Sequence, residues 1–288
     1  MRHLSIDHVT EYAFSTQVTL LPHRLLLYPR ESHNVRIESS NLEIFPAHSL
    51  QWKRDVLDNS VALVTFREPS ERLRIASRMV LQHYEDNPFD FLLDDYAVQH
   101  PFDYAQEDCV ELAPFRQAVY PGDQESVQGW LGGLGLLGPM STLTLLDRMN
   151  REIFGRFFYR MREEPGVQTP DQTLALGSGS CRDFAALFME ACRHLGLASR
   201  FVSGYLHTFD ADLGNASTHA WAEVYLPGAG WKGFDPTGGE VTGNRHIAVA
   251  VARHPEAVPP VAGSYLGSPD RPPLLNVAVR VSAFAGGM

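Results

Sequence analysis

The chain has 288 residues, ordinary hydrophobic and charged fractions, and a formal net charge of −10 at pH 7. This acidic balance argues against a nucleic-acid partner, because phosphate contacts need a basic surface. No run of about 18 apolar residues occurs, which argues against a membrane span. The start, MRHLSIDHVTEYAF, holds no apolar stretch typical of a secretion signal. We therefore expect a cytoplasmic protein, long enough for two modest domains, without nucleic-acid or membrane partners.

Short segments with alternating or β-branched residues fill the beginning of the chain, and Pro and Asp-Asn turns separate them. They lie at residues 4–9, 24–28, 35–44, 60–66 and 73–81. Strands at this spacing are typical of a sandwich, so we expect residues 1–100 to form a β-sandwich-like domain. Its scattered histidines are interpreted as strand-face or surface residues: His3, His8, His23, His33 and His48.

The stretch from residue 85 to 95 is interpreted as an interdomain connector. Residues 85–95 are acidic and aromatic, but Phe and Leu interrupt any calcium-binding pattern. A short helix is expected at 111–119, followed by a glycine-rich turn region at 122–138. Three of its glycines match GxGxxG by letter, but a proline follows directly and no strand precedes, so we reject a dinucleotide fingerprint.

The remaining pattern predicts helices first and then consecutive strands. One helix is expected over 141–158, and a polar loop covers 160–170. Three alternating segments follow at 200–206, 219–226 and 231–235. This order indicates an α+β domain with an antiparallel sheet, assigned to residues 101–265. The tail, residues 266–288, contains another strand at 274–284 that is expected to pair with one of the two sheets.

The segment 177–196, GSGSCRDFAALFMEACRHLG, predicts a Gly/Ser loop and then an amphipathic helix that begins at Cys181. Gly196 stands where such a helix ends. Unpaired N–H groups and the positive end of the helix dipole favour a thiolate at a helix start. Taken alone, Cys181 could equally be a small core residue.

The segment THAWAEVYL places His219 on one face of a strand, and the turn at 227–230 predicts a hairpin back through GWKGFDPT. If Tyr225 pairs with Trp231, His219 and Asp235 become diagonal neighbours, roughly 7–8 Å apart at the backbone. An odd shift of register would put them on opposite faces of the sheet. The pattern therefore predicts a His–Asp pair downstream of the cysteine helix.

Cys181, His219 and Asp235 together offer a nucleophile, a base and a carboxylate that orients the base, which is the arrangement of a thiol triad. The other cysteines compete poorly. Three carboxylates flank Cys109 and disfavour a thiolate, and Cys192 is interpreted as a buried small hydrophobe. The cysteine spacing suggests neither disulfides nor zinc, and HExxH, CxxC and GxSxG motifs are missing. We expect no metal or cofactor.

The segments GSGSCRDFAALFMEACRHLGLASRFVSGYL and THAWAEVYLPGAGWKGFDPTGG resemble the bacterial transglutaminase-like superfamily, with a Cys opening a helix, an HAW strand and a DPT turn. HVTEYAF, LLLYPRESHNV and RHIAVAVARHPEAVPPVAGSYLG extend the resemblance over nearly the whole chain. It implies a papain-like α+β core with Cys181 as nucleophile, His219 as general base and Asp235 as orienting carboxylate. Ala186 departs from the many relatives with His there. Trp221 is expected either to shield the His–Asp bond from water or to pack in the core.

The resemblance implies acyl transfer on protein or peptide amides through a thioester. Hydrolysis by a peptidase or amidohydrolase is the favoured outcome, crosslinking of a primary amine is the first alternative, and a non-catalytic peptide-binding scaffold is the second. The oxyanion would be held by the Cys181 N–H and a second donor. Tyr159, Gln168 and Gln172 are the candidates for that donor.

Two further residues of the motif are expected to have structural roles. Asp183 should favour the helix start through its charge, and Arg182 should lie at the surface or in a salt bridge. The expected partner is a protein or peptide substrate, and the sequence does not predict the oligomeric state.

Overall fold

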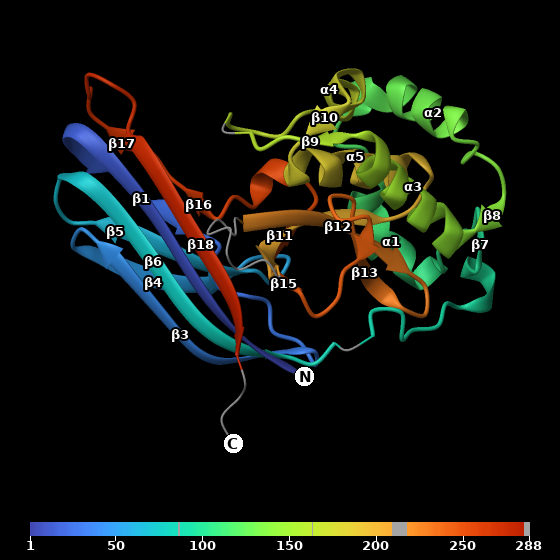
Figure 1. The fold of residues 1–288 in the computed structure, drawn as a ribbon, viewed down its shortest axis with the longest axis horizontal. Coiled ribbons are helices and arrows are strands. Elements are labelled where there is room, and N and C mark those ends of the chain that lie inside the picture. Colours follow the sequence, from blue (N-terminus) through green and yellow to red (C-terminus); the bar gives the residue numbers. More distant parts are fainter. Residues whose placement is uncertain (86, 163, 209–217, 285–288) are drawn as a thin grey trace.

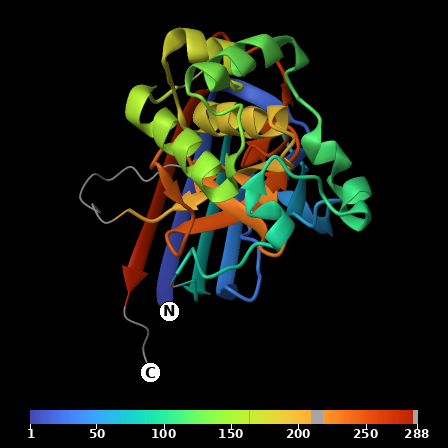
Figure 2. The same cartoon turned by 90° about the vertical axis from the view of Figure 1, so that its right-hand side faces the viewer.

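In the computed structural model, which describes residues 1–85, 87–162, 164–208 and 218–284, a long-stranded β-sandwich lies beside a mixed core of helices and sheet (Figure 1). The sandwich holds both the first and the last strand of the chain. The helices gather on the side of the core away from the long strands (Figures 1 and 2). No helix formed by these described residues has both the length and the apolar character needed to cross a membrane.

Two antiparallel sheets build the sandwich. One joins β17 (Tyr265–Leu266), β1 (Arg2–Leu20), β6 (Ser70–His83) and β3 (Val35–Phe45) in that order, with β18 (Leu274–Phe284) also paired to β1. The other joins β16 (Val261–Ala262), β2 (His23–Leu25), β5 (Ser60–Phe66) and β4 (His48–Arg54). Every second side chain from Leu4 to Thr10 is buried, as expected for a strand with one face on a core. The expected strands are confirmed, although the one expected at 24–28 covers only His23–Leu25. Strand β4 was missed: Leu50 and Trp52 alternate with polar residues, but the run is short and most of its side chains are exposed.

The end of the chain returns to this sandwich. Strand β18 runs antiparallel to β1, from Phe284 opposite His3 to Leu274 opposite Ala13. The short strands β16 and β17 pair with β2 and β1. The strand expected at 274–284 is therefore confirmed, and its partner is the sandwich sheet.

Five α-helices form the helical part of the core within the described residues: α1 (Gln106–Arg116), α2 (Gln124–Gly133), α3 (Thr142–Arg156), α4 (Pro170–Leu176) and α5 (Cys181–His194). The helices expected around α3 and α5 are confirmed, and α1 begins and ends earlier than expected. The expectation of turns at 122–138 is wrong, because Val127 and Leu131, one turn apart, are fully buried and Gly135 (φ 66°) follows the helix end. Helix α4, which was not expected, starts with Pro170 and a capping box between Thr169 and Gln172.

The core sheet has the strand order β14-β13-β12-β11-β15. Its strands are β11 (Ser199–Leu206), β12 (Thr218–Leu226), β13 (Gly230–Asp235), β14 (Glu240–Val241) and β15 (His246–Ala252). Helix α5 packs on β11 and β12, and the buried small residues Ala220 and Ala222 on β12 belong to the same apolar core as the helix. Strand β15 was missed because a short, wholly apolar run does not distinguish a strand from a helix.

Short elements connect these parts: η1 (Asp95–Ala97), β7 (Gln99–His100), η2 (Pro121–Asp123), β8 (Met140–Ser141), β9 (Phe158–Tyr159), β10 (Ser178–Gly179) and η4 (Pro255–Ala257). The predicted fold class, a β-sandwich-like domain before an α+β core with the cysteine helix on an antiparallel sheet, is confirmed.

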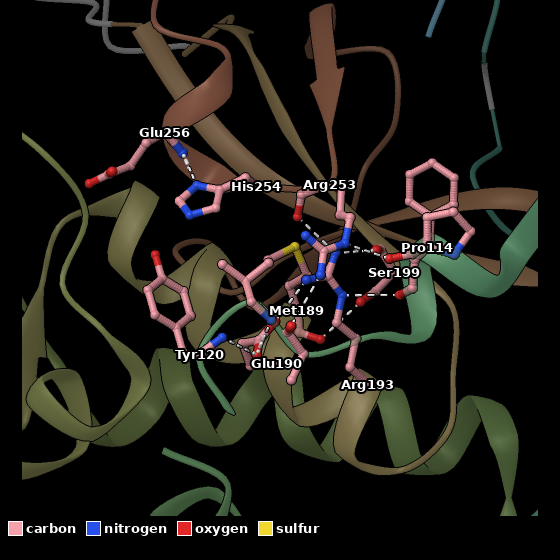
Figure 3. A network of polar contacts seen from close by, with 12 residues as sticks. Pro114, Tyr120, Met189, Glu190, Arg193, Ser199, Arg253, His254 and Glu256 are labelled. Carbon is pink, nitrogen blue, oxygen red and sulfur yellow. Dashed lines mark hydrogen bonds and ion pairs between the residues drawn. The ribbon is translucent and has the colours of Figure 1, made fainter. Parts of the chain in front are cut away.

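A buried ion pair fixes the carboxy-terminal half of α5 in this core (Figure 3). Nη1 of Arg193 lies 2.8 Å from Oε1 of Glu190, and neither side chain is exposed. Glu190 also accepts two main-chain N–H groups, those of Val119 and Tyr120. Arg193 donates to three main-chain carbonyls, those of Phe115, Ser199 and Arg253. The pair thus ties the helix to the chain after α1 and to the ends of β11 and β15.

Candidate active site

Cys181 is the first residue of α5, so its N–H has no acceptor within the helix. Ser180 is the N-cap residue, and its N–H and hydroxyl both donate to Oδ2 of Asp183, each at 2.8 Å. Strand β10, just before the cysteine, pairs in parallel with β9, so that Tyr159 lies opposite Gly179. A Cβ on Gly179 would lie 2.9 Å from that of Asp183, so this approach requires glycine. These contacts fix the backbone that presents the thiol.

Asp183 also holds the loop that precedes the helix. Its Oδ1 accepts from Nη1 of Arg162 at 2.7 Å and from the N–H of Gln168 at 2.8 Å. The side chain is fully buried, so its role goes beyond the helix-start charge expected from the sequence. Arg182 donates to the main-chain carbonyls of Arg162 and Glu164. Its role is therefore to bind main-chain carbonyls of the loop rather than the surface or salt-bridge role expected.

The hairpin of β12 and β13 brings His219 and Asp235 together. Tyr225 lies opposite Trp231, the register expected from the sequence. Nε2 of His219 lies 2.7 Å from Oδ2 of Asp235, and the two side chains are only 9% and 1% exposed. Oδ1 of Asp235 accepts the N–H of Thr237 at 2.9 Å, which holds the carboxylate at the DPT turn.

The thiol of Cys181 lies near the His219 imidazole, and its interaction with the ring raises the pKa of His219. Because Asp235 occupies Nε2, the ring nitrogen left for the thiol is Nδ1. The structure therefore brings Cys181, His219 and Asp235 into one continuous series of contacts, although they lie far apart in the chain.

The electrostatics of the pair favour charged partners. Burial lowers the pKa of His219, but the Asp235 charge and hydrogen bond, with the nearby Cys181, outweigh this and raise the pKa to about 10. Burial raises the pKa of Asp235, but His219 and His246 outweigh it and hold this pKa well below its usual value. At neutral pH the carboxylate is ionised and the imidazole protonated, the charge state that can pair with a thiolate.

Sequence reasoning missed a second histidine on the same carboxylate. His246, the first residue of β15, places Nε2 3.1 Å from Oδ2 of Asp235, and its side chain is 2% exposed. The available signal was a histidine at the start of the apolar run HIAVAVA, shortly after the DPT turn. Because the strand itself was not predicted, no pattern in the sequence linked that histidine to Asp235.

The two histidines and the Asp235 carboxylate form a set of possible metal ligands. His219, Asp235 and His246 each offer one ligand atom, and these atoms lie within 4.8 Å of one another. The N–H of Gly243 points to Nδ1 of His246 at 3.4 Å. A backbone N–H can only donate, which assigns the proton to Nε2. A protonated Nε2 donates to Asp235 and has no lone pair for a cation, so the set suits a hydrogen-bonded carboxylate.

The indole of Trp221 packs against both imidazoles. Its ring centroid lies 6.1 Å from that of His219 and 5.3 Å from that of His246. A Cβ on Gly204 would lie 2.7 Å from Cη2 of the indole, so β11 can pass this ring only with glycine there. Leu57, from the sandwich, packs in the same cluster as Trp221. Shielding and core packing, the two roles expected for Trp221, are therefore compatible.

A pocket of about 670 Å³ opens beside Cys181 and His219. Described residues of the loop from Met161 to Val167 and of the segment from Pro255 to Pro260 contribute to its lining. Tyr159 also lines this pocket. Burial, followed by the nearby Cys181, raises the pKa of Tyr159 to about 12, so the hydroxyl stays protonated at neutral pH.

The other sequence candidates are not among the described residues that line the pocket. The side chain of Gln172 accepts the N–H of Thr169 in the α4 capping box, and Oε1 of Gln168 accepts a threonine hydroxyl.

Cys192 is fully buried, which raises its pKa. Cys109 donates to a main-chain carbonyl at 3.5 Å. All three cysteines of the chain are free thiols, and Cys181 alone among them borders the pocket.

The fold and this site define a papain-like α+β core behind a β-sandwich, and sequence comparison gives the family. The bacterial transglutaminase-like N-terminal region matches residues 4–82, and the transglutaminase-like superfamily core matches residues 137–236. The chain belongs to the transglutaminase-like superfamily.

Relatives extend the similarity over the whole chain. Uncharacterized proteins of Mycobacterium tuberculosis and Mycobacterium bovis are each 28% identical over 300 residues, which covers 98% of this chain and 93% of theirs. The crystal structure of a candidate cysteine protease from Cytophaga hutchinsonii superimposes with a TM-score of 0.72 at 17% identity. The superposition covers 100% of this chain and 92% of that one. That likeness shows a shared fold, and family membership supports a cysteine-dependent enzymatic function in general terms.

Proposed function

We propose that this protein catalyses cysteine-dependent acyl transfer on protein or peptide amides, with hydrolysis as the main outcome. The observation that supports this most directly is the series of contacts from Cys181 through His219 to Asp235 at the edge of an open pocket. A buried imidazolium next to a thiol keeps a nucleophile ionised. The open side gives a substrate carbonyl access to the sulfur.

In the first step the Cys181 thiolate attacks the carbonyl carbon of an amide, and a C–S bond forms. The negative charge moves to the carbonyl oxygen. The free N–H of Cys181, at the positive end of the α5 dipole, is one donor to that oxyanion. We propose the Tyr159 hydroxyl as the second donor, because of the three candidates it alone lines the pocket.

In the second step the C–N bond breaks and the His219 imidazolium gives its proton to the leaving ammonia or amine. A thioester remains on Cys181. His219 then takes a proton from water, and the hydroxide displaces the thiolate to give a carboxylic acid. Asp235 stays ionised throughout and stabilises the imidazolium.

A primary amine in place of water would give a crosslinked product. We propose hydrolysis instead, because the sequence carries no feature that marks an amine-acceptor site. Binding of a peptide without turnover would make the protein a scaffold.

The test compares wild type with Cys181→Ala on glutamine-containing peptides, with and without a primary amine. We expect ammonia release or peptide cleavage by wild type alone, and a trapped thioester on Cys181 by mass spectrometry. Incorporation of the amine in preference to water would replace hydrolysis by crosslinking. Equal behaviour of the two proteins would rule out catalysis by this cysteine.

Thiol labelling tests the charge state without a substrate. We expect iodoacetamide to modify Cys181 at pH 5–6, well below the value of about 8.5 at which a free thiol titrates. Cys109 and Cys192 serve as internal controls in the same peptide map. Labelling of Cys181 only near pH 8.5 would favour the scaffold.

We also propose a cytoplasmic location and a protein or peptide partner. Cell fractionation with an antibody against the native protein tests the location. Recovery of a peptide bound to Cys181→Ala would identify the partner.

A further inference from the structure

We propose that His246 is a positioning residue that orients the Asp235 carboxylate toward His219, an inference that rests on the proposed function. His246 comes from β15, at the edge of the core sheet opposite β14. Its Nε2 lies 3.1 Å from Oδ2 of Asp235, the same oxygen that His219 contacts at 2.7 Å. His246 would therefore act on Cys181 only through Asp235 and His219.

A reciprocal pair of backbone contacts fixes the His246 ring. The His246 N–H donates to the carbonyl of Gly243 at 2.9 Å, and the Gly243 N–H donates to Nδ1 of His246 at 3.4 Å. With Nδ1 as acceptor, the neutral ring carries its proton on Nε2 and donates it to Asp235. The turn before β15 thus selects the tautomer that serves the carboxylate.

The Asp235 carboxylate then has three donors. The Thr237 N–H holds Oδ1, while His219 and His246 hold Oδ2. The carboxylate is 1% exposed, so water is poorly placed to replace a lost donor. Without His246, one main-chain N–H would be the only fixed contact against which His219 is aligned.

The charged side chains near His246, Glu240 and Arg245, bind each other. Oε1 of Glu240 lies 3.8 Å from Nε2 of His246, and Arg245 binds that same oxygen. Trp221 covers the ring, with centroids 5.3 Å apart and an edge-on geometry. Asp235 is therefore the nearest partner of Nε2 among the contacts of the described residues.

Two amide variants test the roles of the two ring nitrogens of His246 separately. In His246→Asn the shorter amide can still accept from Gly243 but does not reach Asp235. In His246→Gln the longer amide can still donate to Asp235. His8→Gln is the matched control, because His8 is equally buried, on β1, where it contacts Tyr205 at 2.9 Å and Thr10 at 3.0 Å.

The readout is the rate of Cys181 alkylation by iodoacetamide between pH 4.5 and 9, with folding checked by urea unfolding. In His246→Asn we expect the midpoint to rise by about one pH unit, which lowers the rate at pH 6 about two- to sixfold. We expect His246→Gln and His8→Gln to keep the wild-type profile. Added EDTA should change none of the profiles.

The proposal is overturned if folded His246→Asn keeps the wild-type profile, if His246→Gln falls as far as His246→Asn, or if EDTA changes the wild-type rate. Should His246→Asn fail to fold, a folded His246→Gln with reduced reactivity at pH 6 would still overturn it. A wild-type protein without reactivity at pH 5–6 would instead contradict the proposed function, so the two failures are distinguishable.

Discussion

The two ends of α5 both bury charged groups, but they satisfy them differently. At the carboxy-terminal end, the partners of Glu190 and Arg193 among the described residues are each other and main-chain groups, and neither side chain is exposed (Figure 3). At the amino-terminal end, His219 and Asp235 bind each other, and His219 also contacts the thiol of Cys181. That thiol borders a pocket of about 670 Å³.

This difference separates stabilising charge from reactive charge. A buried pair whose every partner is fixed main chain has nothing left to offer a substrate, and removing one member leaves the other uncompensated. The His219–Asp235 pair differs because His219 also contacts the Cys181 thiol, which lies at a pocket where its charge can act on a ligand. We therefore expect changes at the amino-terminal end to alter chemistry and changes at the carboxy-terminal end to alter stability.

Asp235→Asn should have the largest effect. The amide keeps the shape of the carboxylate but loses the charge that stabilises the His219 imidazolium. In a triad this change costs about 10⁴-fold in turnover, or about 5 kcal/mol. The measurement is peptide hydrolysis at pH 7 with urea unfolding as control. A fully active Asp235→Asn protein would contradict the expectation that changes at the amino-terminal end of α5 alter chemistry.

Arg193→Met should have the next largest effect, and on folding. It leaves Glu190 charged and buried, which costs about 3–5 kcal/mol of unfolding free energy. Urea unfolding measures this. Arg151→Met is the control, because Arg151 pairs with Asp147 at the surface and should change stability by less than about 1 kcal/mol. A stable Arg193→Met protein that has lost Cys181 reactivity would reverse the assignment.

The active-site residues at the amino-terminal end of α5 were largely predictable from sequence, because the patterns that place them are local. Alternation along THAWAEVYL and the turn after it determine one hairpin register, and that register places Asp235 near His219. The start of α5 follows from its apolar period and from Cys181 after a Gly/Ser loop. These patterns depend on neighbours in the chain.

The supporting residues were not predictable in the same way. His246 reaches Asp235 only through the tertiary placement of β15, and its own tautomer depends on a turn at Gly243. Glu190 and Arg193 look like ordinary helix charges in sequence, and their burial depends on the distant end of α1 and the segment after it. Helix α2 was hidden because glycines weaken helical propensity, yet Val127 and Leu131 pack it into the core.

Tyr159→Phe should have a smaller effect on chemistry. Loss of one oxyanion donor costs about 10²-fold in turnover, while alkylation of Cys181 by iodoacetamide should not change. Tyr120→Phe is the matched control at the other end of α5. Burial raises the pKa of Tyr120 to about 12 as well, and its hydroxyl has no hydrogen-bond partner among the described residues. Equal losses in both variants would mean that the hydroxyl of Tyr159 has no role of its own.

The pH dependence of stability should give the sharpest contrast between the two ends of α5. The pKa of His219 rises from 6.5 to about 10 on folding, so its contribution to stability is complete below pH 6.5 and is lost as the pH rises toward 10. The pKa of Asp235 falls on folding, so its contribution is present above about pH 4 and is lost in acid. The stability lost in His219→Gln should therefore be greater at pH 5.5 than at pH 9, as measured by urea unfolding. Arg193 stays protonated over this range, so the loss in Arg193→Met should be similar at both values. If the stability lost in His219→Gln were equal or larger at pH 9, His219 would not be held as an imidazolium. The two ends of α5 would then show the same pH dependence, and the charge at the amino-terminal end would not differ in kind from the buried Glu190–Arg193 pair.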